Sequence, residues 1–216
     1  IKIYNDIMLK GGVKMDVMKH YIGTRAFYKK VLLVAVPIMI QNGITNFVSL
    51  LDNIMVGQVG TEQMSGVAIA NQLVFIFNLC IFGAVAGAGI LGAQFYGSGN
   101  SEGVRDTFRF KLLFGVILSA IFAVIFLTVG EPLIQQFIHQ GEGIGDLEAT
   151  RSYGKAYLEV IVIGILPFAL TQCYSGTLRE TGETVIPMIA GIIAVLVNLV
   201  FNYILIFGKL GAPELG

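Results

Sequence analysis

Charge is scarce in this sequence. Of its 216 residues, 13% are charged, whereas a soluble globular domain carries about 25%. Hydrophobic residues make up 55% of the chain, so the composition excludes an ordinary soluble domain and indicates a membrane protein. The formal net charge is zero, and this balance gives no reason to expect a nucleic-acid partner.

Residues that build metal centres, disulfides and many catalytic sites are also few. The chain has two Cys and two His. Cys80 and Cys173 lie inside apolar stretches and are interpreted as buried small hydrophobic residues, without a disulfide framework or metal-ligand spacing. His139 has no ligand set nearby. The HExxH motif and paired intramembrane aspartates are missing, and Ser49 has no His in any apolar stretch. We therefore expect no enzyme, no metal centre and no cofactor.

Five stretches are apolar, nearly free of charge and long enough to span a bilayer. About 20 residues at 1.5 Å rise cross the roughly 30 Å hydrocarbon core. The sequence therefore predicts an all-α, polytopic transmembrane helix bundle with five spans. The stretches are 31–61 (interrupted by Asp52), 63–101, 112–130, 160–178 and 184–208.

Lys and Arg are distributed unevenly between the two sides of these spans. Eleven fall in residues 1–30 and the second and fourth connections, and three fall on the other side. The positive-inside rule then places the N-terminus in the cytoplasm of a multi-pass protein of the plasma (inner) membrane. Three parts are predicted: a cytoplasmic segment 1–30, five helices over 31–208, and an external segment 209–216. Residues 131–155 are predicted to be an external acidic loop with a short interfacial helix at 132–139.

Asp52 is the one charge inside its apolar stretch. An Asp at a transmembrane helix centre costs roughly 2.5 to 3.5 kcal/mol, and such residues are retained where they face a cavity or the bundle interior. At 100° per residue, Gln41, Thr45, Ser49 and Asp52 fall within an arc of about 80° on one helix face. Because this stripe cannot face lipid unsatisfied, we expect it to line a cavity or contact other helices.

Other spans carry amides that could complete such a cavity. Asn198 and Asn202 form an i,i+4 pair on one face of the last span, and Gln72 and Gln172 are further cavity candidates. Spacing alone leaves open whether the Asn pair only bonds neighbouring helices. With Asp52 in the same bundle a polar cavity is the better interpretation, because a carboxylate and amide oxygens suit a proton, Na⁺ or an organic cation. By contrast, Gly83 and Gly87 are predicted to permit close helix packing.

Several segments, in their order, resemble the N-terminal half of the multidrug and toxic compound extrusion (MATE) transporters. The matching pieces are PIMIQNGITNFVSLLDNIMVGQVG, TEQMSGVAIANQ, AGILGAQFYGSGN, TLRETGETVIPM and NLVFNYILIFGKLGAPELG. Together they cover about residues 31 to 216. The family has twelve helices in two six-helix lobes, so the resemblance implies five spans of one lobe, a sixth helix beyond GAPELG, and a missing C-terminal lobe of the same chain.

The resemblance also implies roles for three residues. Asp52 matches the acidic residue of the family's first helix, implicated in H⁺ or Na⁺ coupling. Asn198 and Asn202 match the polar pair of the fifth helix, where some members have Asp in place of Asn202. Asp52 is then the expected titrating group of this lobe's cavity. The three residues would form the Na⁺ site, if the coupling ion is Na⁺.

The implied function is secondary antiport, in which small organic cations or drugs leave the cell as H⁺ or Na⁺ enters. Pro37 and Gly43 are plausible bending points of the first helix. A lipid-linked saccharide flippase of the same superfamily is an alternative, but those cavities tend to be cationic, and the predicted spans contain no Lys or Arg in their interiors. A non-transporting membrane subunit is a third possibility.

Overall fold

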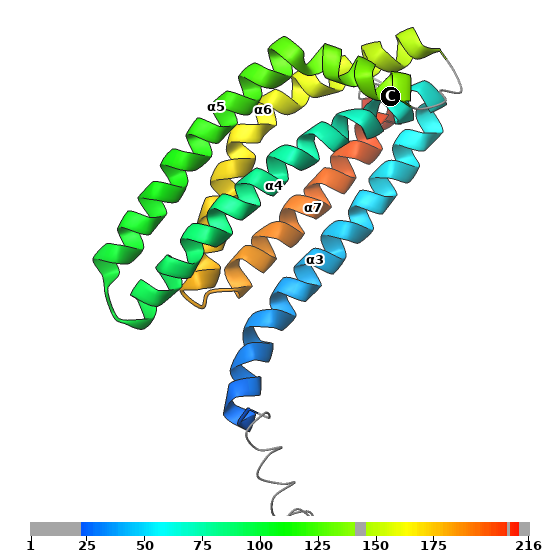
Figure 1. Cartoon of the computed structure of the whole chain (residues 1–216). Coiled ribbons are helices and arrows are strands. Elements are labelled where there is room, and N and C mark those ends of the chain that lie inside the picture. The colour runs from blue at the N-terminus through cyan, green and yellow to red at the C-terminus, as the bar shows by residue number, and fades with distance from the viewer. Residues whose placement is uncertain (1–22, 141–145, 207, 212–216) are drawn as a thin grey trace, which may run out of the picture.

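The computed structural model describes residues 23–140, 146–206 and 208–211, and these residues form helices and turns without a strand. Five long helices lie side by side, and each runs in the opposite direction to the next one along the chain (Figure 1). All five are long and apolar enough to cross a membrane, so the predicted all-α bundle of five spans is confirmed. The elements are α3 (Arg25–Val59), α4 (Thr61–Gly97), α5 (Ser101–Gln140), α6 (Leu147–Glu180), α7 (Val185–Ile206) and a 3-10 turn, η1 (Lys209–Gly211).

The bundle has two ends, which we name from α3. The near end, where α3 begins at Arg25, carries the short α4–α5 and α6–α7 connections. Gly99 and Gly182 have φ of 74° and 87° there, a conformation that favours glycine. The far end, where α3 ends at Val59, carries the starts of α4 and α6 and the end of α7. Helices that follow one another in the chain therefore alternate in direction, as in a multi-pass membrane protein.

The helices extend beyond the charge-free stretches that predicted them. Helix α3 begins at Arg25, where the Thr24 hydroxyl accepts from the Phe27 amide at 3.2 Å, so the predicted boundary at residue 30 falls inside a helix. The prediction of a loop over 131–155 with a separate helix at 132–139 is wrong for the described residues, since α5 continues to Gln140 and α6 begins at Leu147. Glu131 lies inside α5, and its carboxylate accepts a hydrogen bond from Lys155 Nζ of α6 at 2.7 Å.

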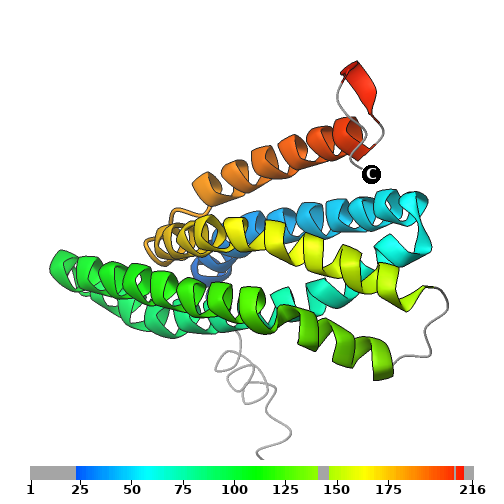
Figure 2. The same cartoon turned by 90° about the horizontal axis from the view of Figure 1, so that it is seen from above.

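The five helices divide into two groups. Helices α4, α5 and α6 pack closely on one another, whereas α3 packs chiefly against α7 and touches α4 more sparsely (Figures 1 and 2). The three-helix group encloses the apolar core, in which Phe77 meets Phe122 edge to face with ring centroids 5.3 Å apart. The buried core residues are Ala70, Leu73, Phe77, Ile81, Phe126, Ile134, Leu158, Ile165 and Ala169.

Close helix approach occurs at a different glycine pair from the predicted one. A Cβ added at Gly66 would lie 2.7 Å from the Gly154 nitrogen and 2.7 Å from the Thr150 carbonyl oxygen, so α4 and α6 meet backbone to backbone. At Gly83 and Gly87 an added Cβ would meet no described atom within 4 Å. The spacing of Gly83 and Gly87 identified a helix face without bulky side chains, but such a face does not by itself specify which helix packs on it.

The two cysteines differ in their surroundings. Cys173 is buried as expected, and its Sγ donates to the Lys111 carbonyl at 3.3 Å. Cys80 is exposed on the surface of the bundle, so the prediction that it is buried in this chain is wrong. The side chain of His139 lies outside the described residues.

Candidate ion and substrate site

The structure brings three predicted site residues together between α3 and α7. Asn202 Nδ2 donates to Asp52 Oδ1 at 3.0 Å and to Asn198 Oδ1 at 3.3 Å. The i,i+4 spacing holds both Asn side chains on one face of α7, and the packing of α7 on α3 turns that face toward Asp52. Asp52 and Asn202 are partly buried, and Asn198 is exposed.

The chemistry of this cluster suits a monovalent cation. Asp52 supplies carboxylate oxygens, and none of the ion pairs found in the described residues involves it. The amides supply neutral oxygens and N–H donors. No group of three or more His, Cys, Asp and Glu side chains among the described residues could hold a metal ion. A proton, Na⁺ or an organic ammonium therefore fits this donor set better than a divalent metal.

Tyr157 of α6 forms a polar contact with α4 and was not singled out from the sequence. Its hydroxyl donates to Asn71 Oδ1 of α4 at 3.2 Å, and it lies within electrostatic reach of the Asp52 carboxylate. The charge-free stretch of the fourth span begins at residue 160, although the sequence allowed that span to borrow a turn from residues 156–159, which include Tyr157. No sequence signal assigned the phenol to the surroundings of Asp52.

The remaining cavity candidates do not converge on Asp52. The Thr45 hydroxyl donates back to the Gln41 carbonyl at 2.9 Å, within its own helix. Thr45, Ser49 and Gln72 are exposed in this chain. Gln41 lies eleven residues before Asp52, on nearly the same face of α3 but about 16 Å away along the axis. The polar residues on this face of α3 therefore lie at two separate heights along the bundle, with Asp52 at one and Gln41 at the other.

At the near end, the level of Gln41, the structure places charged side chains that the sequence analysis assigned to connections. Arg179 Nη2 of α6 donates to Gln41 Oε1 at 2.7 Å. Arg179 lines a pocket of about 390 Å³ between α4 and α6, together with Gln172 and Glu180. Gln172 thus belongs to this level and not to the Asp52 cluster.

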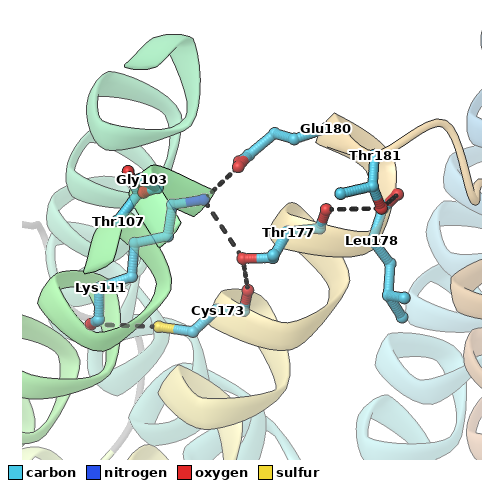
Figure 3. A network of polar contacts seen from close by, with 8 residues as sticks. All are labelled: Gly103, Thr107, Lys111, Cys173, Thr177, Leu178, Glu180 and Thr181. Atoms are coloured by element: carbon cyan, nitrogen blue, oxygen red, sulfur yellow. Dashed lines mark hydrogen bonds and ion pairs between the residues drawn. The ribbon is translucent and has the colours of Figure 1, made fainter. Parts of the chain in front are cut away.

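Lys111 is fully buried in α5, which contradicts the expectation that the spans hold no interior Lys or Arg. Its ammonium forms an ion pair with Glu180 and donates to Thr177 Oγ1 at 3.3 Å (Figure 3). The predicted span began after Lys111 because it was defined as a stretch without charged residues. Pairing with Glu180 offsets the desolvation of the ammonium, so α5 carries it inside the bundle.

The MatE family model matches residues 37–204. This chain belongs to the MatE family. The predicted resemblance is thereby confirmed, and the matched segment contains Asp52, Asn198, Asn202, Gln41 and Arg179. The chain is a multi-pass membrane protein of that family.

Relatives with names and solved structures agree with this assignment. The chain is 31% identical over 189 residues to the probable multidrug resistance protein NorM of Thermotoga maritima, covering 87% of this chain and 39% of the relative. It is 28% identical over 195 residues to the multidrug resistance protein PmpM of Pseudomonas aeruginosa, covering 89% and 39%. The chain spans about two fifths of the length of these relatives.

Two solved structures share the fold. One is described as the outward-facing conformation of a multidrug resistance MATE family transporter of the MOP superfamily, with a TM-score of 0.71, 21% identity, and coverage of 85% of this chain and 39% of that one. The other is a MOP superfamily transporter from Pyrococcus furiosus described as having a binding pocket of reverse polarity, with a TM-score of 0.68 and 20% identity over the same shares. At these identities the likeness concerns the fold of the MatE helices.

Proposed function

We propose that this MatE chain is part of a secondary antiporter that exports organic cations or drugs in exchange for H⁺ or Na⁺. The observation that carries the proposal is the hydrogen bond from Asn202 to Asp52 inside the bundle. It supports a role for Asp52 as the coupling residue, because a carboxylate with one amide donor and no basic partner among the described residues retains affinity for a cation. The names of the relatives, which are multidrug resistance proteins, support the cargo class.

Coupling in this proposal is competition for one carboxylate. An unpaired carboxylate in a cavity of low dielectric constant is costly, and a proton, Na⁺ or the cationic cargo each relieves that cost. Protonation also removes the charge that the Asn202 N–H group stabilises, which weakens the α3–α7 contact. Each ligand shifts the equilibrium between inward-open and outward-open states by its differential affinity for the two.

The same proposal places the near end of the bundle in the cytoplasm of a cell with the chain in its plasma membrane. The excess of Lys and Arg at this end supports that orientation. The complete protein would then carry a second lobe, and the outer faces of α3 and α7, which are largely exposed here, would take part in the cavity between the lobes.

The test is Asp52→Asn in the complete protein, purified and reconstituted in vesicles. We expect ion-driven export of a cationic dye to fall at least tenfold, because the neutral amide cannot exchange a proton or neutralise a cation. Asp106→Asn is the matched control, since Asp106 is exposed at the near end and pairs with Arg109 at 3.2 Å. Full retention of coupled export in Asp52→Asn would refute the proposal.

The coupling ion is assigned by separating the two gradients. Export of the same dye is measured in two sets of vesicles. One set has a Na⁺ gradient and equal pH on both sides, and the other has a pH gradient and no Na⁺. Export in one condition identifies the ion that Asp52 exchanges, and the Asp52→Asn variant should lose export in that condition.

A further inference from the structure

Arg179 lacks an acidic partner. Its Nη2 donates to the neutral amide oxygen of Gln41 at 2.7 Å, and none of the ion pairs found in the described residues includes it. Its Nε is buried and has no hydrogen-bond partner there. A buried N–H of a charged group without an acceptor is costly. An anion that displaced the groups covering Nε would give this N–H an acceptor and remove that cost.

The neighbouring carboxylate does not neutralise Arg179 because Lys111 holds it. Glu180 forms the buried ion pair with Lys111 (Figure 3), and its carboxylate lies against a notch on α4. Glycine makes that notch, since a Cβ at Gly92 would lie 2.6 Å from Glu180 Oε2 and one at Gly89 would overlap Glu180 Oε1. The Lys111–Glu180 pair thus leaves Arg179 as an uncompensated positive charge.

An apolar pocket adjoins this charge. The pocket of about 390 Å³ lies between α4 and α6, with walls from Phe82, Val85 and Ile90. On the α6 side it is lined by Gln172, Arg179 and Glu180, and the Glu180 carboxylate is neutralised by its ion pair with Lys111. Its lining includes no α5 residue, and Arg179 reaches from it to α3. The pocket therefore opens on the side of the three-helix group that faces α3 and α7.

We propose that Arg179 binds the anionic group, a carboxylate or a phosphate, of a molecule whose apolar or aromatic body occupies this pocket. The Nε and Nη2 groups form one edge of the guanidinium, which is the edge that binds a carboxylate with two parallel hydrogen bonds. Gln41 occupies the Nη2 position and Nε is empty. The anion satisfies Nε and replaces Gln41 at Nη2.

The anion site extends the proposed export function. That its ligand is the exported cargo rests on the proposed function. Asp52 and Arg179 then form a bipolar cavity, with the carboxylate at one level and the guanidinium about 16 Å away at the level of Gln41. Such a cavity accepts cargo that carries a carboxylate besides its cation. A purely cationic cargo would use Asp52 alone.

The test uses two dyes that differ in one carboxylate. Rhodamine 110 carries a free carboxyl group, and rhodamine 123 is its methyl ester. Binding of each to the complete protein in phosphatidylcholine nanodiscs is measured by fluorescence anisotropy. In Arg179→Gln we expect affinity for the acid to fall about tenfold, which corresponds to about 1.4 kcal/mol, and affinity for the ester to change less than twofold. Arg179→Lys should fall between, because it keeps the charge without the two-point edge.

Gln41→Ala provides a change of opposite sign. Removing the competing amide should raise affinity for the acid about threefold and leave the ester unchanged, which a merely structural role of Arg179 would not produce. An acid-to-ester affinity ratio that is the same in wild type, Arg179→Gln and Gln41→Ala overturns the inference. Ester binding that depends on Asp52 reports separately on the proposed function, so the two failures are distinguishable.

A third arm separates the two sources of the anion. Binding of the acid dye is measured again in nanodiscs that contain 20 mol% phosphatidylglycerol. If this lipid reduces binding of the acid to wild type but does not reduce the residual binding to Arg179→Gln, a lipid phosphate is the occupant. Acid binding that phosphatidylglycerol does not displace identifies the carboxylate of cargo. Either result supports the anion site, whereas displacement that is equal in both proteins overturns it.

Discussion

Asn202 and Asp52, separated by 150 positions in the sequence, are joined by a hydrogen bond of 3.0 Å between α7 and α3. The amide nitrogen is the donor and the carboxylate is the acceptor. Since the same nitrogen also donates to Asn198 at 3.3 Å, Asn202 stands between the other two residues. The bond connects the two helices that pack least on the rest of the bundle. Two of the predictions below concern the surroundings of Asp52, and two concern contacts within the group of α4, α5 and α6.

Replacing Asn202 should affect transport more than replacing Asn198. Asn202→Leu removes the donor to Asp52, and a hydrogen bond to a charged group contributes about 1.5 to 3 kcal/mol. We expect a tenfold or greater fall in ion-coupled export by the complete protein in vesicles. Asn198→Leu, the matched control on the same helix face, should cost about threefold or less. Equal losses in both variants would show that the direct bond to Asp52 is not what matters.

Tyr157→Phe tests the phenol that sequence reasoning missed. The variant loses the hydrogen bond to Asn71 and the hydroxyl near Asp52, while the ring is retained. A neutral hydrogen bond contributes about 0.5 to 1.5 kcal/mol, so dye export should fall about two- to tenfold. Tyr153→Phe, one turn earlier on α6 and exposed, should export as wild type does. The idea fails if the two variants behave alike.

The buried pair of Lys111 and Glu180 should dominate the stability of the near end. Lys111→Met leaves a carboxylate without its partner, and breaking a buried pair costs about 3 to 5 kcal/mol, so the temperature of thermal unfolding in detergent should fall clearly. The double variant Lys111→Met with Glu180→Gln should recover most of that loss. Arg109→Met, in an exposed pair with Asp106, should leave the unfolding temperature unchanged. A double variant no more stable than Lys111→Met would contradict this account.

The contact between Gly66 and Gly154 should tolerate no added methyl group. Gly66→Ala places a Cβ 2.7 Å from backbone atoms of α6, and overpacking of this kind costs about 1 to 3 kcal/mol. Thermal unfolding should occur at a lower temperature than in wild type. Gly87→Ala on the same helix meets open space, and it should be neutral or slightly stabilising because alanine favours helix. An unchanged unfolding temperature in Gly66→Ala would show that the two helices can separate without cost.

The five helices were predictable because a bilayer limits the choices. Backbone groups in lipid must bond within their own segment, so an apolar stretch of about 20 residues forms a helix. The ends of the helices were less predictable. The helix α5 continues through the charged residues Glu131 and Lys111. Their partners, Lys155 and Glu180, lie on α6 and could not be identified from the local sequence.

The candidate site was partly predictable for a related reason. The period of the helix placed Asn198 and Asn202 on one face, and the cost of burying Asp52 marked that residue as unusual. Neither argument states which helix faces which. Tyr157 entered the site, and Thr45 and Ser49 did not join it, because the rotation of α3 against α7 and of α6 against both is set by packing.

The sequence by itself determined the number of spans, the membrane location and the costly carboxylate at position 52, because each follows from local composition and helical geometry. The tertiary structure alone decided that Asp52 meets Asn202, that Lys111 holds Glu180, and that Arg179 therefore lacks an acid. These contacts join positions 150 and 69 residues apart in the two bonded pairs. Contacts of that range depend on which helix faces meet, and side-chain size and charge decide this when the bundle packs.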